Sequence, residues 1–139
     1  MSYDENNVFA KILRGELPSV KVCEDDMALA LMDIMPRSDG HVLVIPKGPA
    51  RNILDATPEQ LDACIRMVQK LSHAVIKAFD ADGVTLTQAN EAAGGQEVFH
   101  LHFHVLPRHD GVKLRRPASE MASPEELQAN AAKIKAALD

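Results

Sequence analysis

The feature that most constrains this chain is a run between Phe99 and Val105 in which histidines alternate with apolar residues. Three of the six histidines of the chain stand two residues apart: His100, His102 and His104. Because side chains two apart on a β-strand share a face, the run predicts a strand with three imidazoles on one side. The intervening residues would face a core: Phe99, Leu101, Phe103 and Val105. Pro107 is expected to end the strand.

The row of imidazoles has three chemical interpretations. Alternating strand histidines can bind zinc. Alternatively, one histidine can act as a nucleophile while its neighbours manage protons and charge. In the third interpretation the histidines form a polar sheet face that meets only water. Ring nitrogens need hydrogen-bond partners, which favours the first two interpretations, but periodicity does not separate them.

The remaining pattern predicts a single α+β domain over residues 1–139. Short strands, joined as antiparallel hairpins, are expected at residues 20–23, 27–32, 42–45 and 84–88. Helices are expected over residues 8–13, 57–79 and 122–138. Residues 1–5 are polar and are expected to be loose.

The two longer helices have explicit start signals. Thr57 is an N-cap, with Pro58 at the first helical position and Gln60 closing a capping box, and Ser123 begins a second such pattern. Six apolar residues predict the face of the first helix that covers the sheet: Leu61, Ile65, Val68, Leu71, Val75 and Ile76. The C-terminal helix could pack on its own domain or on a partner subunit.

Composition excludes some classes of function. The net charge of −5 argues against a general nucleic-acid binder held by phosphate attraction. The two cysteines are far apart and form no Cys-x-x-Cys motif, which is typical of a cytoplasmic chain with free thiols. No apolar stretch approaches membrane-spanning length and none resembles a signal peptide, so no membrane association is expected.

Five segments resemble the histidine triad (HIT) superfamily. Residues 100–106 match its His-x-His-x-His-x-x signature, where x is apolar. The other similar segments, in chain order, are Phe9–Ser19, Asp33–Pro36, Gly40–Lys47 and Gly94–Phe99. The resemblance covers residues 8–109 and leaves 122–138 as a C-terminal helical extension. It implies a five-stranded antiparallel sheet with a long helix, a short N-terminal helix and a C-terminal helix, assembled as a homodimer.

The resemblance also implies an activity. It indicates attack on the α-phosphate of a nucleoside phosphoramidate or a dinucleoside polyphosphate, with release of the nucleoside monophosphate. His102 would be the nucleophile and would form a nucleotidyl-histidine, while its other ring nitrogen donates to the carbonyl of His100. His104, as imidazolium, would bind a phosphate oxygen. His41 would complete the relay.

A purine nucleotide or nucleotide conjugate is the implied ligand. Asp33 would accept from the ribose hydroxyls, because a carboxylate can accept from two adjacent hydroxyls. Backbone amides from Gly95 to Glu97 would cradle the phosphate. The full set of implied nucleotide-binding residues is Phe9, Ile12, Leu31, Asp33, Ile34, Asn90, Gly95, Gln96 and Val98. No cofactor is expected, although a divalent cation could accompany the substrate phosphates.

The sequence departs from the family pattern at two points. Glu97 stands where better-known members often have Ser or Thr; its charge could repel a phosphate, or its protonated form could donate to an amine leaving group. The histidine that often follows the Pro46-Lys47 step is absent.

Two other functions stay open. The chain could be a non-catalytic nucleotide-binding scaffold, or a metalloenzyme that uses the histidines. No carboxylate lies within the histidine motif to complete a zinc site, so no metal is expected. Two substrate classes stay open within the enzyme interpretation. The Gly-Gly-Gln loop and the chain length favour the phosphoramidate, whereas the His-Val-Leu-Pro-Arg sequence that ends at Arg108 also occurs in relatives that hydrolyse dinucleoside polyphosphates.

Overall fold

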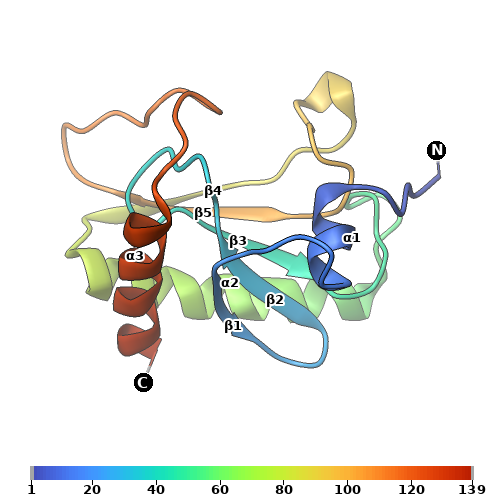
Figure 1. The fold of residues 1–139 in the computed structure, drawn as a ribbon, viewed down its shortest axis with the longest axis horizontal. Helices are drawn as coiled ribbons and strands as arrows, with labels where there is room; N and C mark the ends of the chain where they lie inside the picture. Colours follow the sequence, from blue (N-terminus) through green and yellow to red (C-terminus); the bar gives the residue numbers. More distant parts are fainter. Residues whose placement is uncertain (1, 139) are drawn as a thin grey trace.

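The computed structural model describes residues 2–138. At its centre is a five-stranded antiparallel sheet with the strand order β1-β2-β3-β5-β4 (Figure 1). The strands are Lys21–Glu24 (β1), Ala28–Met32 (β2), Val42–Pro46 (β3), Gly83–Thr87 (β4) and Phe103–Arg108 (β5). The helices are Val8–Leu13 (α1), Pro58–Phe79 (α2) and Pro124–Leu138 (α3), with a short 3-10 turn at Ala92–Gly94 (η1). The predicted α+β class and the five-stranded sheet are confirmed.

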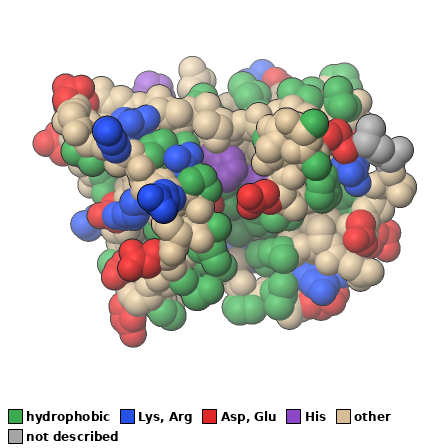
Figure 2. Space-filling view, turned by 90° about the horizontal axis from the view of Figure 1, so that it is seen from above, with side chains coloured by type: hydrophobic (Ala, Val, Ile, Leu, Met, Phe, Trp, Pro, Cys, Tyr) green, Lys and Arg blue, Asp and Glu red, His purple; other side chains and the backbone are tan. Residues whose placement is uncertain are grey.

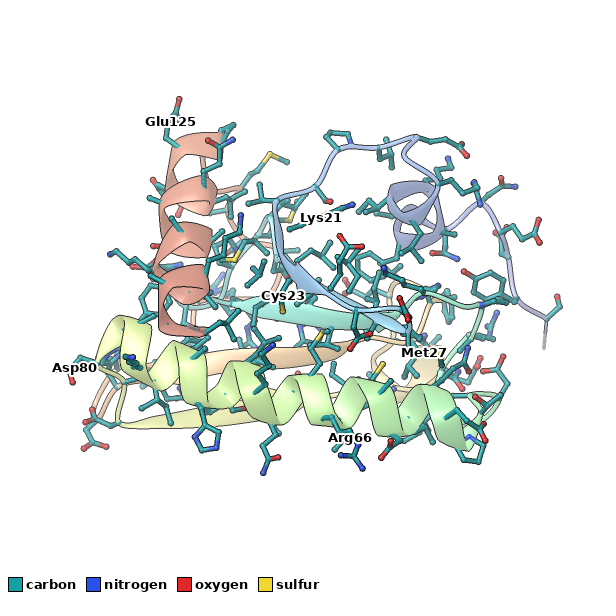
Figure 3. All side chains as sticks on the ribbon, turned by 90° about the horizontal axis from the view of Figure 1, so that it is seen from below. Lys21, Cys23, Met27, Arg66, Asp80 and Glu125 are labelled. Carbon is teal, nitrogen blue, oxygen red and sulfur yellow. The ribbon has the colours of Figure 1, made fainter. Side chains whose placement is uncertain are left out.

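The long helix α2 covers one face of the sheet (Figure 3). Its predicted start is confirmed, because the Thr57 and Gln60 side chains form a reciprocal capping box. The predicted apolar face is wrong at two positions: Ile65 is 51% exposed and Ile76 is 40% exposed. The row in contact with the sheet runs through Cys64, Leu71 and Val75. A residue one step further along turns about 100° around the helix axis, which places Ile65 and Ile76 outside the contact.

The C-terminal helix packs on its own chain. Its apolar stripe of Leu127, Ala131 and Ile134 is buried, and α3 contacts α2 and β1. No helix within residues 2–138 combines the length and the apolar content that a membrane crossing would require.

The strand that carries the histidines is shifted from its predicted position. β5 begins at Phe103, so His100 and His102 precede it and only His104 lies within it. It also continues through Pro107 to Arg108, where the sequence predicted its end. β3 pairs with β5 only as far as Val105, so Pro107 has a neighbouring strand on one side alone. A sheet tolerates proline at such an edge position.

The two faces of the sheet carry different cores. The large core lies between the sheet and the helices α2 and α3. A smaller cluster lies on the opposite face, beneath α1, and consists of Phe9, Leu29, Leu31, Leu43 and Ile45. Because Leu43 pairs directly with His104 across β3 and β5, His104 lies on this α1 face.

Candidate active site

Four histidines gather on the α1 face of the sheet. The His102 and His104 rings lie 5.0 Å apart, and the His41 and His104 rings 5.1 Å apart, between centroids. Phe9 from α1 meets His102 edge-on at 5.0 Å. Figure 2 shows this face, with a histidine side chain visible near its centre among apolar, acidic and basic groups.

His102 has one ring nitrogen fixed and the other free. Its Nδ1 lies 2.7 Å from the carbonyl oxygen of His100. A carbonyl can only accept, so Nδ1 carries the proton and Nε2 keeps an unshared electron pair. Burial lowers the pKa of His102, although the bond to the carbonyl opposes that shift. The ring is therefore neutral near pH 7, as a nucleophile requires.

His100 is completely buried and is held at both ring nitrogens. Its Nε2 donates to the carbonyl oxygen of Pro46 at 2.9 Å, and its Nδ1 lies 2.6 Å from the hydroxyl of Tyr3. Burial lowers the pKa of His100 to about 4. Tyr3 belongs to the segment that the sequence predicted to be loose. That prediction is wrong for residues 2–5, because Arg51 and Arg14 donate to their backbone carbonyls.

His41 and His104 form a directed pair. The backbone amide of Arg37 donates to Nδ1 of His41 at 3.1 Å, so the proton of His41 lies on Nε2. That Nε2 donates to Nδ1 of His104 at 2.8 Å, which places the proton of His104 on its own Nε2. The predicted relay contact of His41 is therefore present in the structure.

The protonation state of His104 differs from the prediction. Burial, with a further contribution from His102, lowers the pKa of His104 to about 4, and burial lowers that of His41 to about 3. The predicted imidazolium at His104 is thus disfavoured in the free protein. A neutral His104 can still donate to a phosphate oxygen through its Nε2–H group.

Asp33 lies beside this pair at the end of β2. Its Oδ1 accepts from the amide of Met35 at 2.8 Å, which is ordinary turn chemistry, and its Oδ2 lies 3.4 Å from Nε2 of His41. Burial raises the pKa of Asp33. The sequence did not predict this contact between Asp33 and His41, since Asp33 is distant from the histidine motif along the chain.

Asp33, His41 and His104 also raise the question of a metal. Within residues 2–138 they form one group whose donor atoms lie within 4.8 Å of one another. A metal-bound histidine normally donates its second ring N–H to an acceptor. Nδ1 of His41 instead accepts from the Arg37 amide, and its Nε2 is protonated. The donor set therefore does not fit a divalent cation without breaking this contact.

The loop before the triad is held by an internal polar network. The buried side chain of Gln96 donates to the carbonyls of Arg51 and Val98, and accepts from Asn52 and from the amide of Glu91. All the hydrogen-bonding capacity of this amide group is thus used inside the loop. Gln96 shapes the loop, and its predicted direct contact with a nucleotide would require breaking these bonds.

Hydrogen bonds within the loop also limit two other predictions, the phosphate cradle formed by the amides of Gly95 to Glu97 and the nucleotide contact of Asn90. The amides of Gly95 and Gln96 donate to the carbonyls of Ala92 and Glu91, so neither is free to cradle a phosphate. Within the described chain, the amide of Glu97 makes no hydrogen bond and stays available. The Asn90 side chain pairs with the Gln88 side chain and accepts from the Ile53 amide.

The predicted nucleotide-binding residues that have apolar side chains divide into two groups. Phe9 and Leu31 belong to the apolar cluster on the α1 face, next to His102, and Ile12 and Val98 pack against that cluster. Ile34 lies outside that cluster and is 49% exposed. Phe99, which was expected in the core, is half-buried instead. The guanidinium of Arg51 lies over its ring, with 4.3 Å between the guanidinium carbon and the ring centroid. Glu97 is exposed to solvent.

Comparison with known proteins identifies the family. Residues 14–111 match the family model described as HIT domain. The chain belongs to the HIT domain family. Members of this family are nucleotide-binding hydrolases and transferases.

Three relatives illustrate the similarity to the HIT family. Adenylylsulfatase HINT3 of Arabidopsis thaliana is 37% identical over 129 residues, which are 84% of this chain and 66% of that protein. The structure of a HIT-like protein involved in cell-cycle regulation from Bartonella henselae, with an unknown ligand, has a TM-score of 0.95 and 53% identity, covering 99% of each chain. A zinc-bound histidine triad family protein from Mycobacterium smegmatis has a TM-score of 0.85 and 33% identity, covering 96% of this chain and 93% of its own.

Proposed function

We propose that this HIT protein is a nucleotide hydrolase or transferase that works through a nucleotidyl-histidine on Nε2 of His102. The observation that carries the proposal is the 2.7 Å hydrogen bond from Nδ1 of His102 to the carbonyl of His100. It fixes the tautomer that leaves Nε2 unprotonated. The relative named adenylylsulfatase supports an adenylyl group as the transferred unit.

In the first step, the electron pair of Nε2 forms a bond to the α-phosphorus of the substrate. The bond from phosphorus to the leaving group breaks, and the leaving group departs with that electron pair. The imidazole becomes cationic, and the carbonyl of His100 accepts from its Nδ1–H and stabilises this charge. In the second step water attacks phosphorus and releases a proton to solvent. The N–P bond breaks, its electron pair returns to Nε2, and the nucleoside monophosphate leaves.

The surrounding groups would orient the nucleotide. The Nε2–H group of His104 and the free amide of Glu97 would donate to phosphate oxygens. The base would lie against the apolar cluster on the α1 face, near Phe9, and against Ile12 and Val98, which pack on that cluster. Asp33 would accept from the ribose hydroxyls.

We favour a phosphoramidate over a dinucleoside polyphosphate as the substrate. An amine leaving group needs a proton, whereas a phosphate leaving group does not. Glu97 is exposed to solvent, and in its protonated form it would donate that proton. We expect that the reaction requires no resident cofactor, and that the chelator EDTA leaves turnover unchanged.

We also propose that the chain forms a homodimer in the cell cytoplasm. The sheet order leaves β4 at an edge, and Leu86 on this strand is 53% exposed. An exposed edge strand with apolar side chains is a template for pairing. Sedimentation analysis is expected to show a dimer for the wild type and a monomer for Leu86→Lys.

The test of the activity is steady-state release of nucleoside monophosphate from an adenosine phosphoramidate. His102→Ala is expected to lower kcat by a factor on the order of 1,000 or more, because it removes the nucleophile. His73→Ala is the matched control, since His73 is exposed on α2. Wild-type-like turnover by His102→Ala would disprove the mechanism. Tight binding of nucleoside monophosphate without turnover by the wild type would favour a scaffold.

A further inference from the structure

We infer that Tyr3 is a positioning residue for the histidine triad, an inference that rests on the proposed function. The Tyr3 hydroxyl lies 2.6 Å from Nδ1 of His100, across 97 residues of sequence. The two rings also meet edge-on, with 5.6 Å between their centroids. Tyr3 touches no group that would react, so it would act through His100.

The direction of this hydrogen bond follows from the opposite side of the His100 ring. Nε2 of His100 faces the carbonyl of Pro46, which can only accept, so Nε2 carries the proton. Nδ1 of the neutral ring is then an acceptor, and the Tyr3 hydroxyl must donate to it. Burial raises the pKa of Tyr3, which keeps this hydroxyl protonated.

The contact reaches the nucleophile through the backbone of His100. The ring of His100 is held at both nitrogens, and the carbonyl of the same residue accepts from Nδ1 of His102. Without the Tyr3 hydroxyl, a buried acceptor would lose its donor, and the His100 ring would be held at Nε2 alone. The orientation of Nε2 of His102 toward phosphorus would then become less well defined.

The N-terminal segment Ser2–Glu5 is fastened on both sides of Tyr3. Arg51 donates to the carbonyl of Ser2 at 3.1 Å, and Arg14 donates to the carbonyl of Glu5 at 2.7 Å. Arg51 also pairs with Glu91 and covers Phe99, which links the segment to the loop before the triad. Tyr3 is therefore held at the site by contacts that its own hydroxyl does not make.

The test compares Tyr3→Phe with Ser2→Ala, because the Ser2 side chain has no role in these contacts. Tyr3→Phe is expected to lower kcat about tenfold and to leave KM unchanged. This is the lower end of the losses that follow when a metal-bound histidine loses its outer hydrogen-bond partner, and His100 is likewise oriented through its second ring nitrogen. Ser2→Ala is expected to match the wild type. In protein labelled with nitrogen-15 histidine, Tyr3→Phe is expected to shift the NMR resonance of Nδ1 of His100 while that of His41 stays in place.

An unchanged kcat or an unshifted His100 resonance in Tyr3→Phe would overturn the inference, as would an equal loss of kcat in Ser2→Ala. Failure of the proposed function gives a different result. In that case the wild type itself would release no nucleoside monophosphate, while the His100 resonance would still shift in Tyr3→Phe.

Discussion

The two faces of the sheet are built on different principles. On the α2 face, apolar side chains of the sheet, α2 and α3 form one continuous core. On the α1 face, backbone groups orient three of the four histidines: the carbonyls of His100 and Pro46 and the amide of Arg37. The fourth, His104, accepts from the side chain of His41. The α2 face holds the larger apolar core, whereas the α1 face combines a small apolar cluster with hydrogen bonds that fix the ring protons of the histidines.

This difference separates stability from chemistry. The α2 face should lose stability when volume is removed, with the site left intact. The α1 face should lose activity or change its pH dependence when a single donor or acceptor is removed. Variants on the two faces can therefore test whether stability depends mainly on the α2 face and activity mainly on the α1 face.

The largest effect on stability is expected from the α2 face. Leu71 is completely buried between α2 and the sheet, so Leu71→Ala should lower the free energy of unfolding by about 2–5 kcal/mol. The kcat of the folded protein should not change. Urea unfolding and kinetics would measure both, with Arg66→Ala on the exposed side of α2 as the control. A large fall in kcat would contradict the division between the faces.

The next effect is a dependence of stability on pH that arises from the α1 face. The folded pKa values of His100 and His104, about 4, lie below the ordinary value of 6.5. As pH falls below that ordinary value, the unfolded chain takes up protons first, so the free energy of unfolding decreases until pH reaches the folded pKa values. The slope should be on the order of 1 kcal/mol per pH unit for each such histidine.

Urea unfolding at a series of pH values between 7 and 4 measures this slope. His100→Gln should reduce it, whereas His73→Gln should leave it unchanged. A stability that stays constant over this range would show that the histidines are not held neutral.

Asp33 tests the nucleotide side of the α1 face. Asp33→Asn keeps the size of the side chain and its acceptor for Met35, but it loses the charge that would bind the ribose hydroxyls. KM should rise about tenfold, as expected for the loss of hydrogen bonds to a charged group. The comparison to make is between ribose and 2′-deoxyribose substrates. The preference of the wild type for ribose should shrink in the variant, and an unchanged preference would exclude this role.

Glu97 is expected to show the smallest effect. If it protonates an amine leaving group, Glu97→Gln should change the pH–rate profile for a phosphoramidate and leave that for a dinucleoside polyphosphate unchanged. Identical profiles for wild type and variant with the phosphoramidate would exclude the acid role.

Much of the α2 face could be predicted from the sequence, since helical and strand periodicity reports burial directly. The capping box at Thr57 and the C-terminal helix that follows Ser123 are examples. Periodicity was less reliable where the apolar stripe of a helix is wider than the surface that packs on the sheet. Ile65 and Ile76 belong to such a stripe on α2 but are exposed.

The α1 face could be predicted only in part. The alternation of His100, His102 and His104 and the family resemblance gave the residues, but not the atoms that orient them. The contacts of Tyr3, Pro46 and Arg37 are made by a phenol, a carbonyl and an amide that are distant in sequence or that any residue type can supply. A sequence pattern carries no record of such backbone donors and acceptors.

The most direct test of the role of His102 is mass spectrometry of protein quenched during turnover of an adenosine phosphoramidate, wild type beside His102→Ala. We expect an adenylyl adduct on His102 in the wild type and none in the variant. Activity of the His102→Ala protein without any adduct, or an adduct on another histidine, would contradict the assignment of Nε2 of His102 as the nucleophile.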